Sequence, residues 1–145
     1  MADIKTFISW AQVQELTEVL FSRIPFQPSA VVAVSRGGLI PGVMLSHMFK
    51  CRNFHVIHCQ QYGDDHKAQD LQISMGWEAH IALLNADTVV IDDIIDKGTT
   101  FAVLDKKFPN PLKAALISKQ TTPFLYALRT PTEAWVDFPW ELAHG

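Results

Sequence analysis

The sequence predicts an α/β fold, a single domain over residues 1–145 with a mainly parallel twisted sheet flanked by helices. Short apolar, β-branched segments alternate with segments of helical periodicity, which is the pattern of βαβ units. The length of 145 residues suits one domain. Hydrophobic residues make up 48% of the chain and charged residues 19%, which is enough apolar material for a core.

The first predicted element is a helix. Ser9 and Gln12 have the spacing of a capping box, and apolar residues recur at helical intervals from there to about Phe21. Pro25 and Pro28 then end the helix.

A strand, a helix and a second strand follow. The β-branched run 30–34 predicts a strand buried on both faces. Pro41 suits the first turn of a helix that runs to about Phe49, and residues 55–59 predict the second strand.

The second half begins with a polar, weakly patterned stretch, residues 60–78, which we interpret as a long mobile loop. Loops of that length are uncommon in compact domains unless they are functional. Beyond it we predict a strand at 88–91, a helix from about 100 to 107 and a strand at 114–118, followed by an aromatic tail at 134–140.

Composition excludes several classes of protein. The net charge is -3 and no run of Lys or Arg occurs, which argues against a nucleic-acid-binding protein. Cys51 and Cys59 form no CxxC pair, so a disulfide scaffold or structural zinc site is not expected. Without a signal peptide or a run near ~18 apolar residues, we expect a cytoplasmic protein with no membrane segment.

Three polar segments follow predicted strands: 35–38, 92–100 and Lys119. In parallel sheets ligands bind beyond the carboxyl ends of the strands, so we expect these segments to converge. Asp92 and Asp93 would repel each other unless a cation or a hydrogen-bond donor lies between them, and ribose hydroxyls or hydrated Mg²⁺ would serve. The alternative is a solvated turn with an Asp helix cap.

The segment from Asp96 to Thr100 has the features of an anion-binding loop. Gly98 permits close approach of the backbone, whose N–H groups precede a predicted helix, and Thr99 and Thr100 add hydroxyls. The alternative is a Lys-Gly turn with a Thr cap. The sequence contains neither a Walker A loop nor a dinucleotide fingerprint.

The loop Ser35-Arg36-Gly37-Gly38 is a second candidate anion site, unless it is an ordinary strand-to-helix turn. Lys119 would present an ammonium at the same edge, although most lysines are simply solvated. Trp135 could stack on a planar base or merely pack in the tail. His55 and His58 fall on opposite faces of a strand, and we interpret both as structural.

With these segments in place, the chain resembles the purine phosphoribosyltransferases, most nearly their bacterial xanthine-guanine branch. Residues 33–42 look like the family's pyrophosphate-binding loop and the helix after it. Residues 90–100 look like its signature for 5-phosphoribosyl 1-pyrophosphate (PRPP), and residues 134–141 like its base-binding stretch. The segments come in the family's order.

The resemblance implies a type I phosphoribosyltransferase fold with a mobile loop and a small base-binding hood. It implies transfer of the phosphoribosyl group from PRPP to N9 of guanine, xanthine or hypoxanthine in purine salvage, with Mg²⁺ as cofactor and a homodimer or homotetramer as the assembly. A non-catalytic PRPP or nucleotide sensor and a transferase for another base remain alternatives.

The resemblance also implies a role for each site residue. Asp96 would be the catalytic acid or base, and Asp93 and Asp137 would bind metal. The base would contact Asp96, Lys119, Trp135 and Val136. PRPP and its phosphates would contact Ser35, Arg36, Gly37, Gly38, Asp92, Asp93, Lys97, Gly98, Thr99 and Thr100.

The sequence departs from the family at several places. Lys97 stands where the family usually has Thr, and Thr99 where the nearest relatives have Gly. The loop that would close over the reaction, residues 62–73, carries Lys67 but no arginine. The sequence ends soon after Trp140, so we expect a changed base pocket or changed subunit contacts.

Overall fold

The computed structural model describes residues 4–63 and 68–141. Within that part, the main sheet contains β2 (Ala30–Ser35), β3 (Phe54–Gln61), β4 (Leu71–Ser74), β5 (Thr88–Ile95), β6 (Leu112–Ser118) and β7 (Leu125–Arg129). Their order is β4-β3-β2-β5-β6-β7. Neighbouring strands are parallel except β3 and β4, which are antiparallel. The predicted mainly parallel α/β fold is confirmed.

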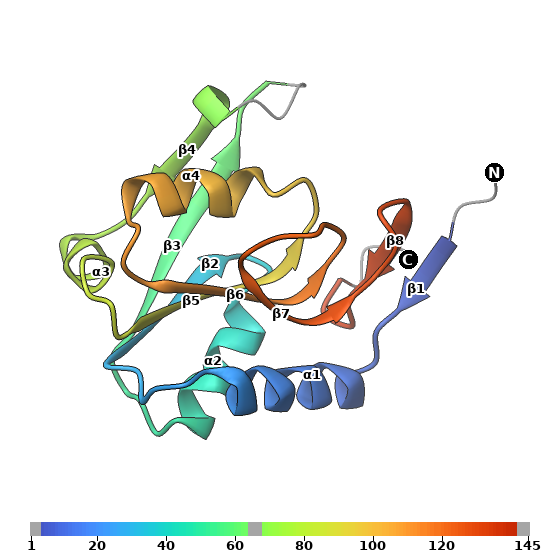
Figure 1. The fold of residues 1–145 in the computed structure, drawn as a ribbon, viewed down its shortest axis with the longest axis horizontal. Coiled ribbons are helices and arrows are strands. Elements are labelled where there is room, and N and C mark those ends of the chain that lie inside the picture. Colours follow the sequence, from blue (N-terminus) through green and yellow to red (C-terminus); the bar gives the residue numbers. More distant parts are fainter. Residues whose placement is uncertain (1–3, 64–67, 142–145) are drawn as a thin grey trace.

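Helices cover both faces of this sheet (Figure 1). On one face lie α1 (Trp10–Arg23) and α2 (Leu39–Met48), whose buried side chains pack with those of the central strands. On the other face lie α3 (Trp77–Ala82) and α4 (Thr99–Lys107), which form a second apolar cluster. The sheet is therefore buried on both faces at its centre, as the parallel arrangement requires.

The central strand β2 shows this burial residue by residue. Val31 and Ala33 belong to the cluster beneath α1 and α2, whereas Val32 and Val34 belong to the cluster beneath α3 and α4. Successive side chains of a strand point to opposite faces, so a continuous β-branched run fills both layers. The strand predicted at 30–34 is confirmed and extends by one residue, to Ser35.

Helix α1 begins where the capping box predicts. The Ser9 hydroxyl accepts a hydrogen bond from the Gln12 backbone N–H at 3.1 Å, and Gln12 Oε1 accepts one from the Ser9 N–H at 2.8 Å. The helix continues to Arg23, two residues beyond the predicted end at Phe21. Both hydrogen bonds satisfy donors that a helix start otherwise leaves free.

The long loop predicted at 60–78 is wrong over most of its length. Strand β3 continues to Gln61, a 3-10 turn (η1) spans Ala68–Asp70, and β4 and the start of α3 follow. Leu71 and Ile73 turn toward the core while Gln72 and Ser74 face solvent, an alternation too short to recognise in sequence. Residues 64–67, including Lys67, lie outside the described residues. The predicted closure of this segment over a ligand therefore stays a prediction.

A second, two-stranded sheet joins the two ends of the chain. It pairs β1 (Ile4–Phe7) with β8 (Ala134–Asp137) in parallel, and we call it the terminal sheet. It stands beside the main sheet near both termini (Figure 1). The Ile8 N–H donates to the Asp137 carbonyl at 2.9 Å, and the buried Phe138 ring stacks on Trp140 at 4.8 Å. Strand β1 was not predicted, because its partner is distant in sequence.

Across residues 4–63 and 68–141, none of the helices combines the length and apolar character that a bilayer crossing needs.

A buried lysine ties β6 to α4. Lys113 is 2% exposed, and its ammonium donates to Asp105 Oδ1 at 2.8 Å and to the Phe108 carbonyl. The Phe108 carbonyl lies beyond the end of α4 and needs a donor. Lys113 therefore satisfies a helix end as well as pairing with a carboxylate.

Replacing this lysine is expected to destabilise the fold. Lys113→Met keeps the aliphatic stem but removes both hydrogen bonds, and we expect a loss of about 1–3 kcal/mol in the free energy of unfolding. Urea denaturation measures it. Lys50→Met, at an exposed position, is the control and should change stability by less than about 0.5 kcal/mol. Equal effects of the two substitutions would contradict a stabilising role for Lys113.

Candidate functional site

The three polar segments predicted to converge follow three adjacent strands. Strand β2 pairs with β5, and β5 pairs with β6, all in parallel. Their carboxyl ends therefore lie side by side at one edge of the sheet. The loop 35–38 leaves β2, the segment 96–100 leaves β5, and Lys119 directly follows β6.

The loop after β2 packs tightly against β5. A Cβ atom on Gly38 would lie 2.8 Å from the Val34 carbonyl oxygen and 3.0 Å from the Asp92 Cα, and one on Gly37 would overlap the Asp93 carboxyl group. A side chain at Gly38 would collide with backbone atoms, and one at Gly37 would displace the Asp93 carboxyl group. The Gly38 N–H donates to the Val34 carbonyl at 2.8 Å, which folds the loop back on its own strand. The peptide bond between Ser35 and Arg36 is cis, and the Arg36 side chain is exposed.

The two adjacent carboxylates lie within β5 and not after it, since the strand continues to Ile95. Asp92 Oδ1 accepts a hydrogen bond from the Asp93 N–H at 2.8 Å. Burial raises the pKa of Asp92 well above its ordinary value of 3.8, and the charge of Asp93 raises it further. Burial also raises the pKa of Asp93. A cation or hydroxyl donors at this point would offset the cost of the buried charge.

Strand β3 borders the same pair. Burial, and then the Asp92 charge, raises the pKa of the Cys59 thiol to about 12. The thiol is therefore protonated at neutral pH and unreactive as a nucleophile. Gln61 lies two residues after Cys59 and on the same face of β3.

Asp96 and Lys119 are brought together. Lys119 Nζ lies 3.4 Å from Asp96 Oδ1, and the Lys119 side chain is largely buried while that of Asp96 is exposed. Backbone contacts hold the two segments in register, since the Lys119 N–H donates to the Ile95 carbonyl and Gln120 Nε2 donates to the Asp96 carbonyl, both at 2.9 Å. The carboxylate of Asp96 and the ammonium of Lys119 thus lie close together at the carboxyl edge of the sheet.

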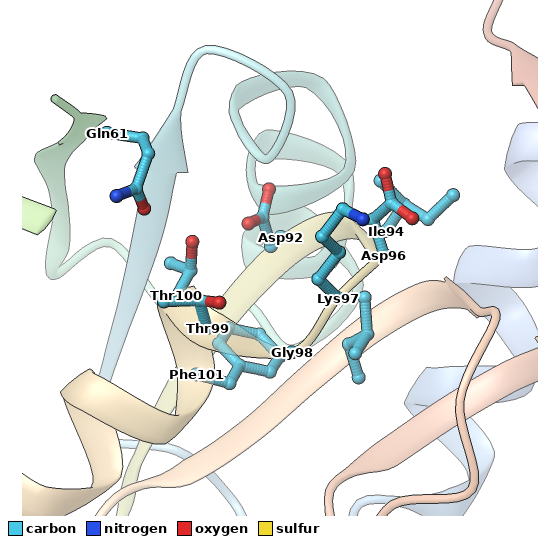
Figure 2. A pocket seen from close by; sticks show the side chains of 10 residues that line it. Gln61, Asp92, Ile94, Asp96, Lys97, Gly98, Thr99, Thr100 and Phe101 are labelled. Carbon is cyan, nitrogen blue, oxygen red and sulfur yellow. The ribbon is translucent and has the colours of Figure 1, made fainter. Parts of the chain in front are cut away.

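The segment 96–100 forms one wall of a cavity of about 160 Å³ (Figure 2). Gly98 has φ 84°, a conformation that favours glycine, and its carbonyl accepts the first helical hydrogen bond, from the Ala102 N–H. The first turn of α4 therefore adjoins the cavity. Its lining consists of Gln61, Asp92, Ile94, Ile95, Asp96, Lys97, Gly98, Thr99, Thr100 and Phe101.

Gln61 is a lining residue that the sequence did not indicate. In Figure 2 its amide lies across the cavity from Asp96 and Lys97. It reaches this position because β3 extends to residue 61 and β2, between β3 and β5, ends earlier. Only the length of β3, which the sequence pattern underestimates, could have revealed it.

The remaining predicted residues belong to the terminal sheet. Trp135 is exposed and its Nε1 donates to Asp137 Oδ1 at 2.9 Å, while Val136 is half-buried against the core cluster. The cavity beside Gly98 has none of these three residues in its lining. The structure thus brings the predicted phosphate-binding loops, the carboxylates of β5 and the Asp96–Lys119 pair to one edge of the main sheet. Trp135 and Asp137 lie on a separate sheet.

No family model matches the chain. Solved structures do. A purine phosphoribosyltransferase from Pyrococcus horikoshii is 29% identical, with 94% of this chain and 93% of that chain covered and a TM-score of 0.74. A xanthine-guanine-hypoxanthine phosphoribosyltransferase from Helicobacter pylori is 23% identical, with 95% and 94% covered and a TM-score of 0.71.

A third neighbour is a hypothetical protein from Neisseria gonorrhoeae with bound ppGpp, 16% identical, with 99% and 93% covered and a TM-score of 0.77. At this identity the likeness concerns the fold alone.

The partly buried, desolvated carboxylate pair predicts an unusual dependence of stability on pH. Asp92 ionises near 3.8 in the unfolded chain but only at higher pH in the fold, so its contribution to stability is greatest below 3.8 and is lost as the pH rises through the folded value. Asp92→Asn, which cannot ionise, should be more stable than the wild type at neutral pH, and this advantage should vanish below 3.8.

Urea denaturation over a pH series, without Mg²⁺ or ligand, measures the difference. Asp87→Asn, at an exposed turn remote from the pair, is the control and should retain the wild-type pH dependence. An Asp92→Asn variant less stable than the wild type at every pH would contradict the predicted burial cost.

Proposed function

We propose that this chain, whose fold is that of solved purine phosphoribosyltransferases, transfers the phosphoribosyl group of PRPP to N9 of a 6-oxopurine. The products are a nucleoside 5′-monophosphate and pyrophosphate. The observation that carries the proposal is the meeting of an anion loop, a carboxylate pair and the Asp96–Lys119 pair at one sheet edge.

In this proposal the pyrophosphate lies at the glycine loop, and the ribose lies beside it at the carboxylates of β5. Arg36 and the backbone N–H groups of residues 35–38 bind the pyrophosphate, where negative charge grows as the bond to C1 of the ribose breaks. Asp92 and Asp93 accept hydrogen bonds from the 2′ and 3′ hydroxyls. Those hydroxyl donors stabilise carboxylates that burial otherwise disfavours.

The 5′-phosphate occupies the cavity beside Gly98. Backbone N–H groups at the start of α4 and the hydroxyls of Thr99 and Thr100 bind its oxygens. Lys97 adds an ammonium to this wall, a charge that the uncharged Thr usual in the family lacks. The sugar is thereby anchored at both ends, which fixes C1 for attack by the base.

The base lies against Asp96 and Lys119. A 6-oxopurine carries N7 and O6 on one edge. Lys119 Nζ and Asp96 Oδ1 are 3.4 Å apart, so the two groups are close enough together to contact O6 and N7 of one base. Lys119 donates to O6, and Asp96 moves the proton at N7 as general acid or base. Trp135 stacks on the ring and the Val136 backbone binds its other edge. Adenine would present an amino group to the ammonium and is disfavoured.

The residues present also fit Mg²⁺. Magnesium in phosphate sites is held by one or two carboxylates together with substrate oxygens and water. Among the described residues no three His, Cys, Asp or Glu side chains form a ready metal group. Asp93, a carboxylate whose desolvation a cation would offset, suits a metal that arrives with PRPP. We assign Asp137, on the terminal sheet, to a second metal. The metal would neutralise charge on the departing pyrophosphate.

A second candidate is a protein on the same fold that binds PRPP or a guanine nucleotide without turnover. The gonococcal neighbour with bound ppGpp favours it, and so does the additional charge of Lys97 at the phosphate wall. Asp96, Lys119 and Trp135 favour the enzyme, because a sensor of PRPP alone needs no base-binding groups.

A panel of bases separates these candidates. We expect pyrophosphate release from PRPP with Mg²⁺ and at least one of guanine, xanthine and hypoxanthine, and none with adenine or uracil. Calorimetry with PRPP accompanies the assay. Tight PRPP binding without turnover of any base would favour the sensor, and turnover of adenine or uracil alone would contradict the role of Lys119.

Asp96→Asn tests the proposed proton transfer. The amide cannot exchange a proton with N7, so turnover should fall about 100-fold or more. PRPP binding, measured by calorimetry, should remain largely intact because Asp96 is assigned to the base. Asp87→Asn is the control and should keep wild-type turnover. Unchanged turnover of Asp96→Asn would refute its catalytic role.

A further inference from the structure

His58 is a polar side chain at the start of the glycine loop, and the proposed reaction does not use it. It lies on β3, exposed, directly opposite Ser35 in the register between β3 and β2. Its Nδ1 is 2.9 Å from the Ser35 hydroxyl oxygen. Ser35 is the last residue of β2 and the first of the loop 35–38.

The second ring nitrogen defines the direction of this hydrogen bond. His58 Nε2 lies 3.4 Å from Gln60 Oε1, which can only accept a hydrogen bond. In the tautomer with the proton on Nε2, the ring donates to Gln60 and Nδ1 accepts from the Ser35 hydroxyl. This hydrogen bond holds the Ser35 side chain toward β3.

The loop is held on its β5 side by the close packing of Gly37 and Gly38, and no side chain of these two residues reaches β3. Gly37 and Gly38 lack side chains, and the hydrogen bonds from Gly38 N–H to Val34 and from Leu39 N–H to Arg36 run along the chain itself. The Ser35–His58 hydrogen bond instead ties the loop sideways to the neighbouring strand. Backbone donors bind an anion well only when they are fixed in direction before it arrives.

We propose that His58 is a positioning residue for the leaving group: by holding Ser35, it fixes the loop backbone that binds pyrophosphate. The proposal rests on the proposed function for the identity of the anion. His58 itself contacts neither the substrate nor the reacting atoms. It acts through one hydrogen bond, so its effect should be confined to PRPP and pyrophosphate and should not extend to the base.

The strand supplies a matched control. His55 lies three residues earlier on the opposite face, where its Nε2 is 2.6 Å from Asn53 Oδ1. It has the same residue type on the same strand but no contact with the loop. His55→Gln should therefore leave pyrophosphate binding and turnover unchanged.

Two substitutions of His58 separate the hydrogen bond from the bulk of the ring. His58→Phe keeps a flat ring without an acceptor, whereas His58→Asn places an amide oxygen near the position of Nδ1. Isothermal calorimetry with inorganic pyrophosphate and Mg²⁺ measures binding. We expect His58→Phe to bind pyrophosphate roughly 3- to 10-fold more weakly, the value of one hydrogen bond, and His58→Asn to recover most of that loss.

Steady-state kinetics give a second readout. The KM for PRPP should rise in His58→Phe by a similar factor, while the KM for the purine stays constant. A general structural defect would alter both KM values and the thermal melting temperature. Pyrophosphate binding equal to the wild type in His58→Phe, or equally weak in both His58 variants, would overturn the proposal.

The binding measurement needs no turnover, so the two hypotheses fail separately. A wild-type protein that binds pyrophosphate but converts no base contradicts only the proposed function. An active wild type with an unaffected His58→Phe variant contradicts only the positioning role. A wild type that does not bind pyrophosphate contradicts both.

Discussion

The close packing of the glycine loop against the carboxylate end of β5 is the constraint on which the rest of the site depends. Gly37 abuts the Asp93 carboxyl group, and Gly38 abuts the backbone at Ile91 and Asp92. A side chain at Gly38 would push the loop away from the strand, and one at Gly37 would displace the Asp93 carboxyl group. The backbone donors proposed to bind one end of a ligand would then lose their register with the carboxylates proposed to bind its middle.

The same packing makes the site electrostatically costly. It partly buries the neighbouring residues Asp92 and Asp93, and desolvation raises the pKa of each. A fold optimised for stability alone would place one carboxylate or none at this position. A pair that is unfavourable in the empty protein is well suited to a ligand that supplies hydroxyl donors and a cation, so stability is exchanged for binding. The protonated Cys59 thiol beside the pair adds no further charge.

How far the sequence predicts the structure depends on how local the cause is. The buried run 30–34 and the capping box at Ser9 are local signals, and the structure contains both features. Strands of four residues such as β1 and β4 show too little periodicity, and β1 forms only because β8 returns from the other end of the chain.

The same distinction applies to the site. Loops that end neighbouring parallel strands must meet, so the grouping of Asp92 with Asp96 and Lys119 follows from strand order alone. Gln61 and His58 enter through the length of β3 and its register with β2, which no local pattern encodes. Strand alternation places His55 and His58 on opposite faces, but it does not show that His58 faces Ser35.

Lys119 connects parts of the site that belong to different sheets. Its N–H donates to Ile95 at the end of β5, its carbonyl accepts from the Thr132 hydroxyl at 3.1 Å, and its ammonium approaches Asp96. Thr132 lies just before β8, the strand that carries Trp135. Because the Lys119 side chain is almost fully buried, it has little freedom to move independently of its backbone. A shift of the terminal sheet would therefore move the ammonium relative to Asp96, so the position of Trp135 and the geometry of the acid–ammonium pair are mechanically coupled through one residue.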